Sequence, residues 1–228
     1  MRSNWSLPIA ASLALGAQAA PPPRVEIAYE VARNGTAVAE VTDRLEHDGR
    51  SYRLQESWKG KGIFALRGEA NRSSRGAVHG RTLRPLEYED RRTGRDTARA
   101  KFGWEAKTLT LQYKGGPETR PLPPGAQDRL SFLWSLAFDP PAKQAVTLHV
   151  VDGKGVSTYV FQVAGRERIR TPAGEFDALK LVKKKDAPGD RSSEVWLAAD
   201  RHHLPVRILV TEKDGTRLDT VAVRIAAQ

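Results

Sequence analysis

The chain of 228 residues contains no cysteine, and it has no apolar run long enough to span a bilayer. Without cysteine, disulfide bonds, thiolate metal sites and cysteine nucleophiles are excluded, as is the acylated cysteine that anchors a bacterial lipoprotein. A membrane-spanning helix needs about 20 apolar residues, so we predict that the protein does not span a membrane. The folded state must therefore depend on burial of an apolar core.

Recognised catalytic motifs are also missing. We find no G-x-S-x-G elbow, no Ser-x-x-Lys pair and no phosphate-binding loop. The five histidines lack the spacing of a helical zinc motif. His202 and His203 would point to opposite faces of a strand, although in a loop they could share a metal, and a surface loop is the simpler interpretation. The sequence thus predicts no catalytic residue, no metal site and no cofactor, and an enzyme is the least favoured class.

The N-terminal stretch is typical of an export signal. Arg2 supplies a basic n-region, residues 7–17 an apolar h-region, and residues 17–19 an A-x-A cleavage site. We expect removal of residues 1–19, which leaves a single all-β domain over residues 20–228. The predicted location is the periplasm, and the absence of cysteine predicts that the protein is not a lipoprotein.

Basic residues outnumber acidic ones, 37 to 27, which gives a net charge of +10 at pH 7. This balance permits attraction to anionic lipid headgroups or acidic cell-wall polymers. Nucleic acid is a poor partner for an exported chain. Apart from Lys183-Lys184-Lys185 the charges are scattered, as on an ordinary solvated face, so an anionic envelope component is one possible partner rather than a requirement.

Apolar residues alternate with polar ones along most of the chain, as in residues 25–31, which is the period of a half-buried strand. Asn34-Gly35 then favours a type I′ turn, and residues 171–174 (TPAG) fit a type I hairpin turn. Glycines break the pattern between residues 60 and 80, where we expect an irregular stretch and then a strand. About a dozen strands in this arrangement predict an antiparallel meander. Because strands twist, the sheet must curl into a barrel or, as we favour, a half-barrel.

One segment, residues 127–138, has the period of a helix instead. Leu130, Leu133, Trp134 and Ala137 fall at i, i+3, i+4 and i+7. Asp128 lies where a carboxylate can accept the unpaired N–H groups of a first helical turn. A lone amphipathic helix among strands must pack on or in the curled sheet.

Several blocks of this sequence resemble the exported bacterial proteins grouped as the domain of unknown function 3108 family. They are AQDRLSFLWSLAF at residues 126–138, TPAGEF at 171–176, WLA at 196–198 and LPVR at 204–207. The resemblance implies a periplasmic protein of mostly Gram-negative bacteria, with no established activity. The C-terminal half is more weakly similar to periplasmic carriers of the localisation-of-lipoproteins type, whose curled sheet shelters acyl chains beneath helices.

Two functions remain open from the residues. In the first, the protein binds a lipid or other amphiphile in an apolar cavity, with Arg129 at its mouth pairing with a phosphate or carboxylate through its planar fork. The candidate apolar residues are Leu130, Leu133, Trp134, Ala137 and Trp196. In the second, tryptophans fill the core, Asp128 only caps the helix, and a basic face or sheet edge docks onto a partner in the cell envelope.

Overall fold

The computed structural model describes residues 20–185, 187 and 189–228, so the predicted export signal lies outside the described residues. Strands β1 to β8 form the first half of the sheet, and a 3₁₀ helix, η1 (Gly62–Arg67), lies between β3 and β4. The strands are β1 (Arg24–Arg33), β2 (Thr36–His47), β3 (Ser51–Gly60), β4 (Glu69–His79), β5 (Thr82–Arg92), β6 (Ala98–Gly103), β7 (Thr108–Gln112) and β8 (Glu118–Pro121).

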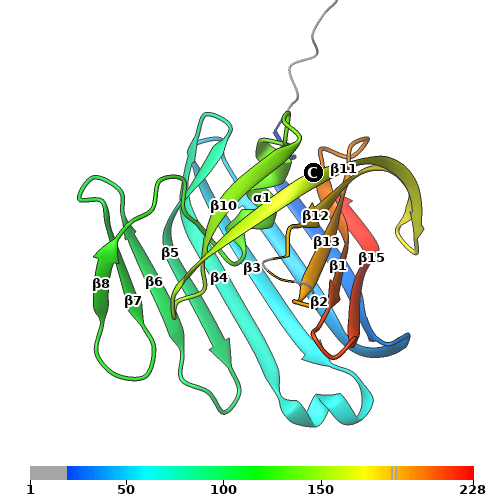
Figure 1. The fold of residues 1–228 in the computed structure, drawn as a ribbon, viewed down its shortest axis with the longest axis horizontal. Helices are drawn as coiled ribbons and strands as arrows, with labels where there is room; N and C mark the ends of the chain where they lie inside the picture. Colours follow the sequence, from blue (N-terminus) through cyan, green and yellow to red (C-terminus); the bar gives the residue numbers. More distant parts are fainter. Residues whose placement is uncertain (1–19, 186, 188) are drawn as a thin grey trace, which may run out of the picture.

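The second half contains the helix α1 (Ser131–Phe138) and seven more strands. These are β9 (Gln127–Asp128), β10 (Ala145–Val151), β11 (Val156–Thr171), β12 (Gly174–Lys183), β13 (Ser192–Ala198), β14 (Leu204–Thr211) and β15 (Arg217–Ala227). Each half is a meander, and the pairing of β1 with β15 joins them into one 15-stranded sheet with β8 and β9 at its edges (Figure 1). All pairings are antiparallel except that of β9 with β10.

Turn residues set the hairpins as their chemistry predicts. Asn34 and Gly35 have φ angles of 50° and 85°, so the two-residue type I′ turn between β1 and β2 is confirmed. The hairpin predicted at residues 171–174 is confirmed as well, because Thr171 pairs with Gly174 across β11 and β12. At the junction of the halves, the Tyr29 hydroxyl donates to the Pro205 carbonyl at 2.7 Å and so ties β1 to β14 across β15.

The sheet curls without closing, and α1 lies within the curve (Figure 1). The helix contacts β5 in the first half and β14 in the second. Trp134 and Phe138 belong to an apolar cluster built mainly on β1 to β7, whereas Leu136, with Phe132 and Leu133 beside it, packs in a second cluster on β10 to β14. The predicted half-barrel wrapped over one helix is therefore confirmed.

The helix begins at Ser131, one turn later than predicted. Gln127 and Asp128 instead form β9 and pair with Val150 and Val151 of β10. The capping role predicted for Asp128 is confirmed, because its Oδ1 accepts the N–H groups of Leu130 and Ser131 at 2.9 and 2.8 Å. A buried strand pairing has therefore replaced the first predicted turn of the helix.

Candidate functional site

A cavity of about 410 Å³ lies between α1 and the inner face of the sheet, and we call it the inner compartment. Its walls come from both halves of the sheet and from the start of the helix. The apolar part of the lining includes Val31, Val41, Phe132, Leu133, Phe161 and Ile208. A helix inside a curled sheet thus leaves apolar space unfilled, in the size range of about 300–1,000 Å³ that small-molecule sites occupy.

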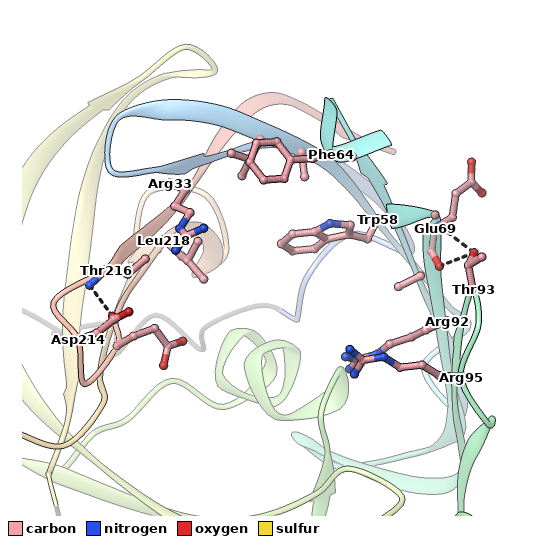
Figure 2. A pocket seen from close by; sticks show the side chains of 16 residues that line it. Arg33, Trp58, Phe64, Glu69, Arg92, Thr93, Arg95, Asp214, Thr216 and Leu218 are labelled. Atoms are coloured by element: carbon pink, nitrogen blue, oxygen red, sulfur yellow. Dashed lines mark hydrogen bonds between the residues drawn. The ribbon is translucent and has the colours of Figure 1, made fainter. Parts of the chain in front are cut away.

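A second cavity, the outer compartment, has a volume of about 450 Å³ and adjoins the first. The two share Trp58, Ala70, Arg92 and Leu218 in their linings. Figure 2 shows Arg33 on one wall, Arg95 on the opposite wall and Trp58 between them, with α1 beyond. The hairpin between β14 and β15 closes one side through Asp214 and Thr216. The shared lining places the two compartments next to each other.

Cations exceed anions around the inner compartment. Its lining contains five basic residues, Arg72, Arg92, Arg129, Lys183 and Arg191, and two acidic residues, Asp43 and Glu56. Focused positive potential in a concave, partly apolar site attracts anions and repels cations. The compartment therefore favours a ligand that carries a negative charge.

Two of these cations are neutralised by carboxylates on the same strand or on a neighbouring one. Arg72 pairs with Glu56, and its Nε lies 3.3 Å from Asp90. Arg92 reaches the same Asp90 with two bonds, Nε to Oδ1 at 3.0 Å and Nη2 to Oδ2 at 2.6 Å. Burial raises the pKa of Asp90, but the hydrogen bonds and charges of Arg92 and Arg72 outweigh it and hold the pKa below its usual value. This network is already charge-balanced without a ligand.

The pKa of Asp43 is shifted in the opposite direction from that of Asp90. Burial, and then the neighbouring Glu56 carboxylate, raise the pKa of Asp43 well above its usual value, although Arg72 and a hydrogen bond from Trp134 oppose the change. The raised pKa favours the neutral carboxylic acid. Asp43 consequently adds little negative charge to the compartment, and its bond to Trp134 fixes the indole in the core.

Arg129 and Lys183 are the two basic residues of the lining that have no carboxylate partner among the described residues. Among the residues that the structure describes, no side chain makes an ion pair or hydrogen bond with the Arg129 guanidinium. Lys183 Nζ lies 4.3 Å above the centre of the Tyr159 ring and forms no ion pair with any described residue. Arg191 is paired with Glu212 at 3.1 Å. The unpaired charges thus sit beside the aromatic side of the compartment.

Comparison with known proteins places the chain in a family. Residues 25–221 match the model of a protein of unknown function, DUF3108. The chain belongs to the DUF3108 family. This membership confirms the family resemblance seen in the sequence. No curated protein is significantly similar to this DUF3108 member in sequence.

Solved structures share the fold at low sequence identity. A β-barrel-like protein of domain of unknown function DUF1849 from Brucella abortus is 10% identical, with a TM-score of 0.63, and the match covers 92% of this chain and 100% of that one. A Bacteroides fragilis protein with a YmcC-like fold, described as exported, has a TM-score of 0.42 at 10% identity, with 91% and 98% covered. A Parabacteroides distasonis protein described as a lipoprotein has a TM-score of 0.41 at 11% identity, with 90% and 97% covered. Only the first supports the fold.

The structure of this DUF3108 member brings two of the six predicted site residues to the inner compartment, Arg129 and Leu133. The other three on or beside the helix, Leu130, Trp134 and Ala137, are 5%, 1% and 2% exposed and lie in the packed core. These three residues pack in the core and do not line the inner compartment.

Trp196, the sixth predicted residue, is 4% exposed and belongs to the same apolar cluster as Trp134 and Phe138, whereas its neighbours Val195 and Leu197 pack with Leu136 in the second cluster. Its ring lies between Lys180 and Arg207, at 4.8 and 4.9 Å. The indole N–H also donates to Glu167. Trp196 therefore joins neighbouring strands and does not line either compartment.

The charged residues on the sheet wall of the inner compartment were not among the predicted site residues. Asp43 and Glu56 are charged residues within strands that otherwise place apolar side chains on the inner face. Such a charge in an alternating pattern indicates either a buried ion pair or a polar point in a cavity. Glu56 and its partner Arg72 show that the first alternative holds here.

Histidine and metal chemistry add little to the site. His202 is exposed, whereas His203 is 2% exposed, so the surface-loop interpretation is correct for His202 only. Burial lowers the pKa of His203, which favours its neutral form. In the described part of the chain, no group of three or more His, Cys, Asp or Glu residues could hold a metal ion. Nor do the described helices include one that is both long and apolar enough to cross a bilayer.

Proposed function

We propose that the protein binds an amphiphile with an apolar body and an anionic group, and that the inner compartment holds it. The observation that carries this proposal is Arg129, a guanidinium without a carboxylate partner among the described residues, beside apolar walls. A partly buried cation next to empty apolar space is stabilised when an anion enters. The chemistry fits a fatty acid or a lipid with a phosphate or carboxylate headgroup.

Binding would combine burial and charge. Removing apolar ligand surface from water contributes about 25 cal/mol for each Å², and Leu133, Phe132 and Phe161 provide the surface that receives it. The net charge of +10 raises the local concentration of an anionic ligand and its association rate. Apolar burial thus supplies the affinity, while Arg129 and Lys183 select the charge.

The proposed place of action is the periplasm. The support is the three-part export signal in residues 1–19 and the absence of a cysteine for lipid attachment. A soluble carrier or sensor of amphiphiles in that compartment would meet its ligands at membranes, where the anionic headgroups attract this basic protein because their charge is opposite in sign.

A displacement assay tests the proposed function. Purified mature protein is titrated with the fluorescent fatty acid cis-parinaric acid, which is then displaced with dodecanoic acid or with dodecanol. We expect Arg129→Gln to weaken dodecanoic acid binding roughly tenfold, because one charge-assisted pair is lost, and to leave dodecanol binding nearly unchanged. Leu133→Trp should reduce binding of both, because the larger side chain fills the compartment.

Arg168→Gln is the matched control, since Arg168 is exposed on β11 and lines neither compartment. It removes the same charge from the chain and should leave both affinities at the wild-type value. The proposal is wrong if the wild-type protein binds neither probe, or if Arg129→Gln and Arg168→Gln change dodecanoic acid binding equally.

A further inference from the structure

The 3₁₀ helix η1 presents two large aliphatic side chains to solvent. Ile63 is 78% exposed and Leu66 is 91% exposed, the highest values among the large apolar residues described as exposed. A 3₁₀ helix has three residues per turn, so side chains at i and i+3 lie on the same side. Ile63 and Leu66 therefore form one apolar point, which we call the η1 tip.

The η1 tip stands at the outer compartment. Phe64, between the two exposed residues, lines that compartment (Figure 2). The turn is held in place by its backbone, because Lys61 N–H donates to the Val38 carbonyl at 2.9 Å and Phe64 N–H donates to the Lys61 carbonyl at 3.0 Å. The exposed η1 tip therefore belongs to a turn that is held by backbone hydrogen bonds beside the outer compartment.

The segment that carries the η1 tip is basic in sequence, and Lys59 within it stays largely exposed, so this lysine can meet an anionic surface. Residues 59–67 (KGKGIFALR) contain three basic residues and no acidic one. The Lys59 side chain is 64% exposed, with only a long contact of 3.9 Å to Glu69, whereas Lys61 is held by Glu30 and Glu40 at 3.3 and 3.1 Å. Aliphatic residues next to lysine and arginine are typical of segments that bind at the interface of anionic bilayers.

The size of the η1 tip decides between a bilayer and a protein partner. A stable protein interface buries about 1,200–2,000 Å² and needs a complementary surface, which two side chains cannot supply. A bilayer accepts isolated aliphatic side chains, because the acyl region adapts to whatever enters it. Two exposed side chains with basic neighbours thus match a lipid surface better than a protein.

We propose that Ile63 and Leu66 insert into an anionic bilayer and so set the outer compartment against the membrane. Docking by the η1 tip does not depend on the proposed ligand. Its use, the transfer of an amphiphile between the membrane and the inner compartment, rests on the proposed function.

Vesicle sedimentation tests the docking. Mature protein is mixed with sucrose-loaded vesicles of phosphatidylglycerol and phosphatidylethanolamine in equal parts, or of phosphatidylcholine alone. We expect the wild-type protein to bind the anionic vesicles more strongly, and the double variant Ile63→Ser/Leu66→Ser to bind them at least roughly tenfold more weakly. Added salt should weaken the binding without abolishing it, because apolar insertion remains.

The control is Leu86→Ser/Val223→Ser, which removes two exposed aliphatic residues on β5 and β15 that line neither compartment. It should bind vesicles like the wild type. Absence of wild-type binding, or an equal loss in the two double variants, would overturn the proposal. If Ile63→Ser/Leu66→Ser does not fold, the single variant Leu66→Gln, which leaves the charge unchanged, replaces it, with the same expectation. Displacement of cis-parinaric acid without vesicles reports the inner compartment separately, so the two proposals can fail independently.

Discussion

At the scale of single residues, the Asp128 carboxylate links the start of the helix to the opposite strands. Its Oδ1 accepts the N–H groups of Leu130 and Ser131, and its Oδ2 accepts the Ser74 hydroxyl. The Tyr52 hydroxyl lies 3.0 Å from Ser74 and extends the chain of bonds to β3. Asp128 is fully buried, so these bonds take the place of water around the carboxylate and offset part of the cost of its burial.

This buried carboxyl predicts a pH dependence. Burial raises the pKa of Asp128 from 3.8 to about 6, against the effect of its hydrogen bonds. The folded protein therefore holds a proton that the unfolded chain has lost between these values. The associated stability is fully present below about pH 4, declines as the pH rises through 6, and amounts to about 3 kcal/mol in total.

Asp128→Asn should remove this dependence, because the amide oxygen can still accept both N–H groups and the amide nitrogen can donate to Ser74. The free energy of unfolding in urea, measured at several pH values from 4 to 7.5, checks it. The variant should gain stability relative to the wild type as the pH rises. If the wild-type protein instead became more stable relative to the variant over the same pH range, the raised pKa of Asp128 would be contradicted.

At the scale of elements, Gly60 sets the position of η1 on β3. A Cβ atom added at Gly60 would lie 2.2 Å from the Phe64 carbonyl oxygen, which is backbone and cannot rotate away. Its φ angle is not in the left-handed region, so the requirement is one of space. Only glycine lets the turn fold back on the strand this closely.

Gly60→Ala is therefore expected to displace η1 and to destabilise the protein by about 1–3 kcal/mol, the usual cost of overpacking. Urea unfolding followed by tryptophan fluorescence measures the change. Gly155→Ala is the control, because a Cβ there meets no atom within 4 Å and its φ angle is not positive. Equal stability of the two variants would show that η1 moves freely on β3.

Sequence periodicity predicted most elements because strand alternation and turn chemistry are local. Asn34-Gly35 needed nothing beyond its own φ preferences. The strand that replaces the predicted first helical turn at Gln127, and the side of β13 on which Trp196 lies, both depend on pairings with other strands, β10 and β12. The cavity depends on how completely Phe132 and Leu133 fill the curve. That outcome is set by summed volumes across both halves of the sheet, which no single segment records.

At the scale of the whole molecule, the sheet stays open and must protect two edges from pairing with other chains. The β9 edge has only two residues, Gln127 and Asp128, which are 2% and 0% exposed. The β8 edge is fully exposed and carries Glu118, Arg120 and Pro121. At β9 the edge is therefore protected by burial and shortness, and at β8 by charge and by a proline that lacks the N–H a new strand would need.

Removing the charges of β8 should expose a pairing edge. Glu118 and Arg120 form two bonds with each other, Nε to Oε1 at 2.6 Å and Nη2 to Oε2 at 2.9 Å. We expect Glu118→Val/Arg120→Val to associate into dimers or larger species as the concentration rises, because valine favours strands and two charged side chains no longer have to be desolvated when edges pair. Size-exclusion chromatography with light scattering measures the mass.

The matched control is Arg166→Val/Asp177→Val, which removes another exposed ion pair, at 3.2 Å, from the internal strands β11 and β12. Both double variants add the same apolar surface and leave the net charge unchanged, so only the edge position differs. Association of the β8 variant alone would assign the protection to the edge. Association of both would assign it to general surface polarity, and a monomeric β8 variant would mean that Pro121 and the short length of β8 suffice to block pairing.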